Sequence, residues 1–210
     1  MKGPFLLRAT LTSPFGRKVR MAVDVLGLGG RIVRQDADTL DENDTLRRQN
    51  PLGKMPVLML GDGTALYDSG VIIEFLQEVA GSEALVPAHG LARYQALTRA
   101  TLADGIADAA LLMVYEYRFR PPEVMKSQRW LAHQRGKIAR ALSAFEAAPP
   151  LADKTDIVSI ALSCALAYLD WRQPVEWRSA HPRLAQWLAA FAAHEPAFAR
   201  TAAAEQMRCD

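Results

Sequence analysis

The feature that most constrains the fold is a change in sequence pattern near residue 81. Before this point, short apolar runs alternate with amphipathic stretches, which is typical of strands alternating with helices. After it, the chain is rich in Ala and keeps helical spacing almost to its end. We therefore predict an α/β plus all-α fold, with an α/β domain at residues 1–80, a linker at residues 81–88 and an all-helical domain at residues 89–210.

The first domain shows the element order βαβ followed by ββα. Strands are predicted at residues 5–11, 31–37, 55–60 and 64–68, and helices at residues 14–28 and 69–81. The gap between the first two strands suits a right-handed parallel crossover. A Gly-Asp-Gly turn at residues 61–63 favours a hairpin between the last two strands, because glycine tolerates positive φ. This order, with Ser-Pro at residues 13–14 and Met-Pro at residues 55–56, predicts a thioredoxin-like domain.

The second domain is predicted to be built around one central helix. Long helices are expected at residues 93–120 and 125–148, each followed by a Pro-Pro pair. The segment at residues 156–171 is apolar nearly all round, which predicts a buried helix. Asp156 is expected to cap the amide of Ser159, and Ser159 to return a weaker form of the reciprocal bond.

Composition and charge argue against several classes of function. With 25 basic and 23 acidic residues, the formal charge of +2 gives no electrostatic case for nucleic acid or an anionic membrane as a partner. No leader-like segment opens the chain, and no apolar run approaches the roughly 20 residues that cross a bilayer, so we expect a cytoplasmic protein. Cys164 and Cys209 stand alone and the four histidines are scattered, so neither a disulfide nor a metal site is expected.

Two turns of the first domain predict a binding site. The Met55-Pro56 bond heads a strand opposite a helix N-terminus, a context that favours the cis form. Such a turn leaves the backbone of Val57 facing outwards, where it can pair with an extended peptide. Asp68 suits an ammonium group, and the two helix N-termini suit carboxylates. A ligand with two carboxylates, an amine and an extended backbone fits this arrangement, and a tripeptide thiol is the obvious candidate.

The chain resembles the cytosolic glutathione S-transferases, of the serine type and bacterial in character. The resemblance covers nearly the whole length, through SPFGRKVR, NPLGKMPVL, the Asp-Ser-Gly before an apolar helix, LADGIADAALLMVYE and DIVSIALSCALAYLDWR. It implies glutathione as cosubstrate and a cis bond before Pro56. It also implies that the cysteinyl part of glutathione pairs with the backbone of Val57, and that Asp68 and Ser69 hold the γ-glutamyl end.

The resemblance assigns the central role to Ser13, whose hydroxyl would donate a hydrogen bond to the glutathione thiolate as a stabiliser, not as a nucleophile. A thiol with a pKa of about 8.5 is only slightly ionised at neutral pH, so its anion needs such donors. Two alternatives stay open: Ser13 is an ordinary helix N-cap, or Thr12 makes the contact. The tyrosine-type mechanism is excluded because the first strand contains no tyrosine.

The remaining predicted contacts depend on the same resemblance. Asp104 is expected to reach the glutathione amine across a dimer interface, and Lys54 to meet a carboxylate unless it is only a solvated loop cation. The basic residues Arg17, Lys18 and Arg20 are interpreted as a solvated face or a subunit contact. Besides Ser13 as the catalytic residue, the predicted glutathione-binding set is Thr12, Phe15, Lys54, Met55, Val57, Asp68, Ser69 and Asp104.

The function implied is that of a glutathione transferase, a cytoplasmic homodimer that conjugates glutathione to a small hydrophobic electrophile in detoxification. Phe15 and Tyr115 are candidates for the apolar wall that holds the electrophile. The alternatives are a non-catalytic binding or regulatory protein of the same fold, and a glutathione-dependent isomerase or dehalogenase. Because residues 1–80 contain no cysteine, a glutaredoxin or a cysteine-type member is disfavoured.

Overall fold

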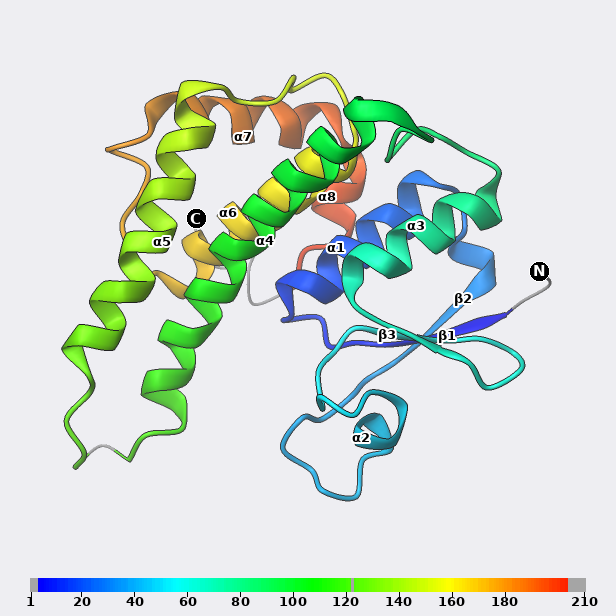
Figure 1. Cartoon of the computed structure of the whole chain (residues 1–210), viewed down its shortest axis with the longest axis horizontal. Helices are drawn as coiled ribbons and strands as arrows, with labels where there is room; N and C mark the ends of the chain where they lie inside the picture. Colours follow the sequence, from blue (N-terminus) through cyan, green and yellow to red (C-terminus); the bar gives the residue numbers. More distant parts are fainter. Residues whose placement is uncertain (1–3, 122, 204–210) are drawn as a thin grey trace.

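The first half of the chain forms a small mixed sheet with helices on both of its faces (Figure 1). The computed structural model describes residues 4–121 and 123–203. The elements of this half follow the predicted order: β1 (Phe5–Arg8), α1 (Pro14–Val25), the short 3₁₀ helix η1 (Gly29–Arg31), β2 (Ile32–Gln35), α2 (Leu46–Gln49), β3 (Val57–Met59), β4 (Ala65–Leu66) and α3 (Ser69–Ala80). In Figure 1, α1 and α3 lie on one side of the sheet and α2 on the other, as in a thioredoxin-like domain.

The sheet has the strand order β2-β1-β3-β4. β1 pairs with β2 in parallel and with β3 in the antiparallel sense, where Arg8 lies opposite Val57. β3 and β4 form the predicted hairpin. The strands are shorter than predicted, because after Arg8 the chain bends towards the start of α1, although the Ala9 amide still donates to the Gln35 carbonyl (3.2 Å).

Local signals explain where the helices of this half begin and end. α1 starts at Pro14, whose missing N–H is no loss at the first helical position, and is capped by Ser13. α3 is capped by Asp68 and stops at Gly81, which adopts the left-handed conformation (φ 62°) that glycine tolerates. The peptide bond before Pro56 is cis, as predicted.

The second half is entirely helical within the residues described. Its helices are α4 (Gly90–Arg118), α5 (Gln128–Ala147), α6 (Ile157–Arg172), α7 (Pro182–His194) and α8 (Pro196–Arg200). α4 and α5 run side by side, and α6 lies behind α4 (Figure 1). No helix in the described part of the chain is long and apolar enough to cross a membrane.

The helix α6 is the buried centre of this half, as predicted. All but four of its 16 residues are buried, and it packs against both α4 and α1. Its N-terminus carries both bonds of a capping box: the Ser159 amide donates to Asp156 Oδ1 (3.1 Å), and Ser159 Oγ accepts from the Asp156 amide (2.8 Å). Asp156 and Ser159 therefore satisfy each other's backbone amides, as predicted.

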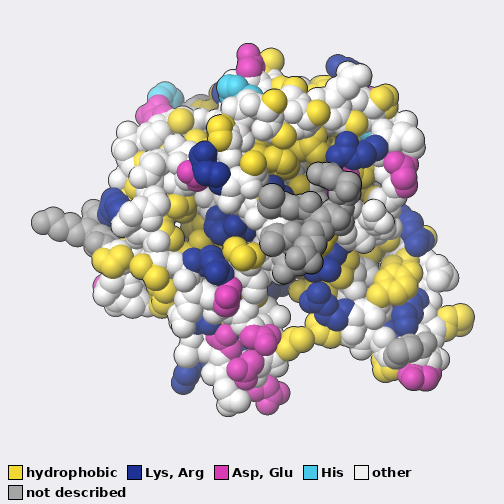
Figure 2. Space-filling model, turned by 180° about the vertical axis from the view of Figure 1, so that it is seen from behind, with side chains coloured by type: hydrophobic (Ala, Val, Ile, Leu, Met, Phe, Trp, Pro, Cys, Tyr) yellow, Lys and Arg dark blue, Asp and Glu magenta, His cyan; other side chains and the backbone are white. Residues whose placement is uncertain are grey.

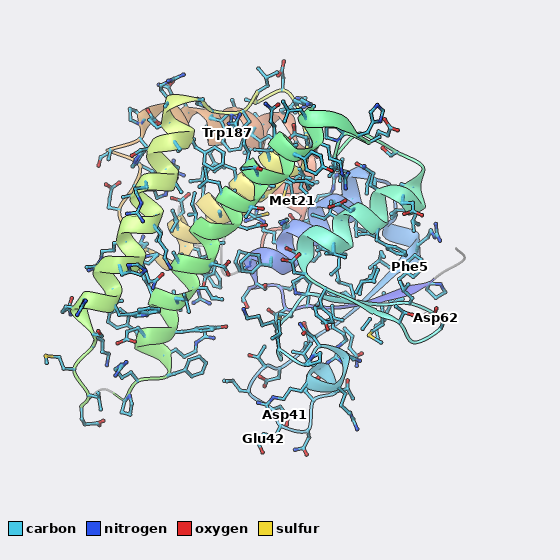
Figure 3. The ribbon with its side chains drawn as sticks, viewed as in Figure 1. Phe5, Met21, Asp41, Glu42, Asp62 and Trp187 are labelled. Atoms are coloured by element: carbon cyan, nitrogen blue, oxygen red, sulfur yellow. The ribbon has the colours of Figure 1, made fainter. Side chains whose placement is uncertain are left out.

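One apolar core runs through both halves of the chain. Phe5 in the sheet, Met21 in α1 and Trp187 in α7 all belong to it (Figure 3). At its centre, the Cys164 thiol of α6 lies 3.5 Å from the Met21 sulfur. Burial raises the pKa of that thiol to about 11, so Cys164 is the inert core cysteine that the sequence predicts. Cys209 lies outside the described residues.

The expectation for the basic residues of α1 is wrong for Arg17 and Lys18. Both are buried instead of solvated, because α1 lies between α3 and the helical half and is covered on both sides. Arg17 donates to the Phe198 carbonyl (2.7 Å) and stacks on the Phe198 ring. Lys18 Nζ donates to Asp104 Oδ2 on α4 (2.6 Å). These two cations therefore tie α1 to the second half of the chain.

The Lys18–Asp104 pair predicts an asymmetric effect of substitution on stability. The Lys18 side chain is 2% exposed, so Asp104→Asn leaves a buried cation without its counter-charge and should lower the free energy of unfolding by about 3 kcal/mol. Adding Lys18→Met to that variant should recover much of the loss, because the unpaired charge is then gone. Denaturant unfolding of the wild type and the variants measures both changes.

Asp108→Asn is the matched control for this experiment. Asp108 lies one turn further along α4 and forms no salt bridge with any residue that the structure describes. Its substitution should change the free energy of unfolding by no more than about 0.5 kcal/mol. Equal losses in the Asp104 and Asp108 variants would contradict the importance of the pair.

Candidate functional site

A cavity of about 450 Å³ lies between loops of the first half and the helices α4 and α6. In Figure 2, a notch separates two lobes at the lower edge of the molecule, and Lys and Arg side chains lie beside it. The cavity is lined from the first half by Thr10, Thr12, Ser13, Phe15, residues 37–40 and residues 52–55, and from the helical half by Asp108, Leu111, Tyr115, Arg118, Phe119, Tyr168 and Arg172. The structure thus brings together five predicted residues: Thr12, Ser13, Phe15, Lys54 and Met55.

Ser13 lies at the bend between β1 and α1, with its hydroxyl at the helix N-terminus. Its Oγ accepts a hydrogen bond from the Gly16 amide (3.1 Å), so the N-cap role is real. This cap uses one lone pair of the oxygen, and the hydroxyl hydrogen has no acceptor among the described residues. Capping the helix and donating to a bound anion are therefore compatible in the same side chain.

Thr10 holds this bend against the cis turn. The Thr10 amide and hydroxyl both donate to Met55 Sδ (3.2 and 3.4 Å), and the hydroxyl oxygens of Thr10 and Thr12 lie 3.2 Å apart. Gly16 permits the close approach, since a Cβ atom there would lie 3.2 Å from the Thr10 carbonyl oxygen. The Ser13 bend and the turn at Met55 therefore form one structural unit.

Val57 is buried, and its side chain does not line the cavity. It pairs with Arg8 of β1, whereas the β3–β4 ladder begins one residue later, with Leu58 opposite Leu66. On the β4 side, the backbone of Val57 has no partner in the ladder of the described strands, which is the condition for pairing with an extended peptide. Its role remains a prediction, and the strand geometry permits it.

Asp68 and Ser69 lie at the N-terminus of α3, outside the lining of the cavity. Asp68 follows a second cis peptide bond, and its Oδ1 accepts from the amides of Gly70 (2.9 Å) and Val71 (3.4 Å). The side chain is exposed, and its Oδ2 has no hydrogen-bond partner among the described residues, so it can accept from an ammonium group while it caps the helix. Ser69 is buried.

Charged side chains at the start of α3 and on α4 affect one another's pKa values. Burial raises the pKa of Asp108, and Lys54 opposes that rise. The negative charges of Asp104 and Asp68 raise it further. Burial also raises the pKa of Asp104, and its partner Lys18 opposes this. Asp104 is thus engaged within its own chain, and its contact with glutathione across a dimer interface stays a prediction.

The wall at residues 37–40 belongs to a loop that Arg8 holds in place. The Arg8 guanidinium donates to Thr45 Oγ1 (2.6 Å) and to Asp44 Oδ1 (2.6 Å). The Asp38 amide donates to the other oxygen of Asp44 (2.8 Å), and this bond is the main reason why the pKa of Asp44 lies below its usual value. The outermost part of the loop lies away from the sheet, and there the exposed Asp41 and Glu42 project outwards (Figure 3).

The helical wall contains residues that sequence reasoning missed. They are Asp108, Leu111 and Arg118 on α4, Phe119 at its C-cap, and Tyr168 and Arg172 on α6. Together with Tyr115, which was expected, they recur at spacings of three and four along each helix, and this periodicity is the signal in the sequence. The periodicity alone did not identify these residues as cavity residues. It shows that they lie on the same face of a helix, but not which part of the molecule that face contacts.

A larger hollow of about 960 Å³ lies beside α6 and α7, away from Ser13. Charged side chains in it are matched within the chain: Arg178 forms a salt bridge with Asp170 (2.7 Å), and Trp177 Nε1 donates to the same carboxylate (2.8 Å). None of the predicted site residues, all of which are described, lines this hollow. The cavity beside Ser13 is therefore the candidate site.

Both halves of the chain match known family models. Residues 12–79 match the glutathione S-transferase N-terminal domain, and residues 128–190 match the glutathione S-transferase C-terminal domain. Over 200 residues, the chain is 30% identical to YibF, an uncharacterized GST-like protein of Escherichia coli (strain K12). That match covers 93% of this chain and 96% of the relative.

Solved structures show the same similarity at the level of the fold. A glutathione transferase family member from Pseudomonas fluorescens Pf-5, with bound glutathione, is 40% identical and has a TM-score of 0.87, over 94% of this chain and 98% of the other. A family member from the same organism, with bound S-(propanoic acid)-glutathione, is also 40% identical and has a TM-score of 0.83 over the same shares. Since both domain models match and a relative aligns over nearly the whole length, the chain belongs to the glutathione S-transferase family.

Proposed function

We propose that this protein is a glutathione transferase that ionises the thiol of glutathione beside Ser13 and conjugates it to a small electrophile in the cavity. The observation that supports this most directly is the Ser13 hydroxyl, whose hydrogen has no acceptor in the described chain although its oxygen caps α1. The protein supplies ionisation and proximity, since the attacking sulfur belongs to the cosubstrate.

The free energy needed to ionise the thiol is within reach of these groups. Lowering the pKa of a thiol from about 8.5 to about 6.5 corresponds to roughly 2.7 kcal/mol. One hydrogen bond to a charged acceptor contributes about 1.5–3 kcal/mol, and a helix N-terminus about 0.3–1 kcal/mol. The Ser13 hydroxyl and the N-terminus of α1 together reach the required range.

Glutathione fits the first domain in an extended form. Its cysteinyl backbone would pair with Val57, where β3 has no β4 partner, and its amine would meet the exposed carboxylate of Asp68. Lys54, an exposed cation at the cavity wall, would bind a carboxylate of the ligand. The glutathione bound to the Pseudomonas fluorescens relative supports this placement, since that protein shares the fold over nearly the whole chain.

The electrophile would lie against the helical wall, where Phe15, Leu111 and Tyr115 offer apolar surface. The relative that holds S-(propanoic acid)-glutathione accommodates a substituent on the sulfur, and we extend that capacity to this chain. Conjugation of small electrophiles in this way would serve detoxification. If glutathione does not bind, a role as a non-catalytic binding protein of the same fold takes the place of this proposal.

Substitution of Ser13 by Ala is expected to raise the pKa of bound glutathione by about 1 to 2, because one hydrogen bond to the thiolate is lost. The ultraviolet absorbance of the thiolate, recorded against pH with the enzyme in excess, measures this pKa directly. For the wild type we expect the thiolate to appear well below pH about 8.5. Glutathione should still bind to the variant, since the other contacts remain.

Thr12→Val and Ser13→Thr are the matched controls. Thr12→Val removes the neighbouring hydroxyl and should leave the pKa of the bound thiol unchanged, whereas Ser13→Thr retains both the cap and the donor. A raised pKa in the Thr12 variant, with no change in the Ser13→Ala variant, would transfer the role to Thr12. The absence of bound glutathione at millimolar concentration in the wild type would reject the transferase proposal.

Substitution of Ser13 by Cys is expected to shift the activity towards thiol transfer. A cysteine at the N-terminus of α1 would have a lowered pKa and would form a mixed disulfide with glutathione. Reduction of a glutathionylated peptide by free glutathione, measured in the variant and the wild type, tests this. We expect only the variant to release the peptide thiol faster than the uncatalysed exchange with glutathione, and equal rates would count against a thiol-binding site at this residue.

We also propose that the protein acts as a homodimer, in the cytoplasm, where a glutathione pool is available. Large apolar side chains are exposed on adjoining helices, with Val71 on α3 and Leu91 and Tyr94 on α4. Sedimentation velocity should give the mass of two chains, and the double variant Leu91→Glu, Tyr94→Glu should give the mass of one. A wild type that sediments as a single chain at micromolar concentration would refute the dimer.

A further inference from the structure

The helical wall of the cavity carries two arginines that the protein leaves without acidic partners. Arg118 ends α4, Arg172 ends α6, and both line the cavity. Neither forms a salt bridge with any carboxylate of residues 4–121 and 123–203. Asp170, two residues before Arg172, is bound to Arg178 instead (2.7 Å). Two cations of one cavity wall are therefore available to an anion.

Arg172 is held in a fixed orientation. The centre of its guanidinium lies 3.5 Å from the centroid of the Trp171 ring, so the cation stacks on the indole. Its Nε is buried and has no hydrogen-bond acceptor among the described residues. A planar cation that stacking already restricts loses little freedom when it binds, and its fork of N–H groups matches the geometry of a carboxylate.

Two tyrosines add hydrogen-bond donors beside these cations. The Arg118 guanidinium lies over the Tyr115 ring, 5.8 Å from its centroid. Burial raises the pKa of the Tyr168 phenol, and the charge of the neighbouring Arg172 opposes that rise. Tyr168 is therefore a neutral phenol at physiological pH, and its O–H is a donor to an oxygen anion.

The charges of the cavity are divided between its two walls. On the side of the first domain, Lys54 lines the cavity, and Asp38 Oδ1 accepts from the Leu40 amide (2.8 Å). Asp108 lines it from α4, and the positive charge of Lys54 opposes the rise in the Asp108 pKa. On the helical side, the arginines adjoin apolar surface from Leu111, Phe119 and Tyr115. Beyond Asp108, the helical wall thus combines apolar surface with two arginines that have no salt-bridge partner among the described residues.

We propose that the preferred electrophile is an apolar compound that carries a carboxylate away from its reacting carbon, and that Arg118 and Arg172 bind this carboxylate. The apolar surface of the same wall holds the carbon skeleton. This inference rests on the proposed function and names the substrate class of the same site. A neutral electrophile of equal size would leave both cations without an anionic partner, so it should react less efficiently.

Two benzylic chlorides of similar size, one charged and one neutral, distinguish the effect of substrate charge from the effect of substrate shape. In para-(chloromethyl)benzoate, the glutathione thiolate forms a bond to the benzylic carbon, the carbon–chlorine bond breaks, and chloride leaves with the electron pair. The neutral twin, para-(chloromethyl)benzamide, reacts by the same displacement and has nearly the same size. The ratio of kcat/KM for the two compounds, each divided by its uncatalysed rate with glutathione, therefore reports recognition of the carboxylate.

In the wild type we expect this ratio to favour the carboxylate by about tenfold or more, which corresponds to at least about 1.4 kcal/mol. In the double variant Arg118→Gln, Arg172→Gln the ratio should fall to near unity. Arg135→Gln is the control: it removes one positive charge from α5, at an exposed arginine outside the cavity. This variant should retain the wild-type ratio. If the double variant does not fold, Arg118→Gln alone, at an exposed side chain, should lower the ratio.

Equilibrium binding gives a second readout that does not depend on turnover. Calorimetric titration with the two S-benzyl glutathione products, one with a carboxylate and one with an amide, should show the same preference and its loss in the double variant. A ratio near unity or below it in the wild type, with normal binding of glutathione, would overturn the carboxylate inference alone. Failure of glutathione itself to bind would overturn the proposed function and this inference together.

Discussion

The structure depends above all on the double burial of α1. This helix lies between its partner α3 and the helical half, and its apolar residues belong to the one core that both halves share. Two cations on it are buried as well, and each has a partner far along the chain: Lys18 meets Asp104, and Arg17 meets the Phe198 carbonyl. A buried cation is tolerated only with such partners, so these bonds fix how the two halves sit against each other.

The cavity follows from that arrangement. Since Ser13 caps the same helix, the position of α1 against α4 and α6 also sets the Ser13 hydroxyl opposite the helical wall. The two walls differ in chemistry, and the proposed function assigns a different part of the reaction to each. The first domain offers unpaired backbone and a free hydroxyl donor, which suit a peptide thiol, and the helical half offers apolar surface with two arginines, Arg118 and Arg172.

One side chain can cap a helix and also bind a ligand, because its hydrogen-bond acceptor and donor groups can have different partners. The oxygen of Ser13 is used by the Gly16 amide, and its hydrogen is not used by the described chain. Asp68 shows the same division, since one oxygen caps α3 and the other is exposed. For this reason the choice between an N-cap and a ligand contact, which looks exclusive in the sequence, is not exclusive in the structure.

The sequence by itself determined the order of the elements, the helix caps at Ser13 and Asp156, the cis bond before Pro56 and the central buried helix. The element order, the caps and the buried helix depend on residues close together in the chain, so local patterns are sufficient to predict them, whereas the cis bond is predicted from its context and the family resemblance. Only the tertiary structure decided that Lys18 is buried and that its partner is Asp104, 86 residues away. It also decided that α4 and α6 turn Arg118 and Arg172 towards one cavity. Periodicity shows which residues share a face of a helix, but the neighbour of that face is set by packing between distant segments, which no local pattern records.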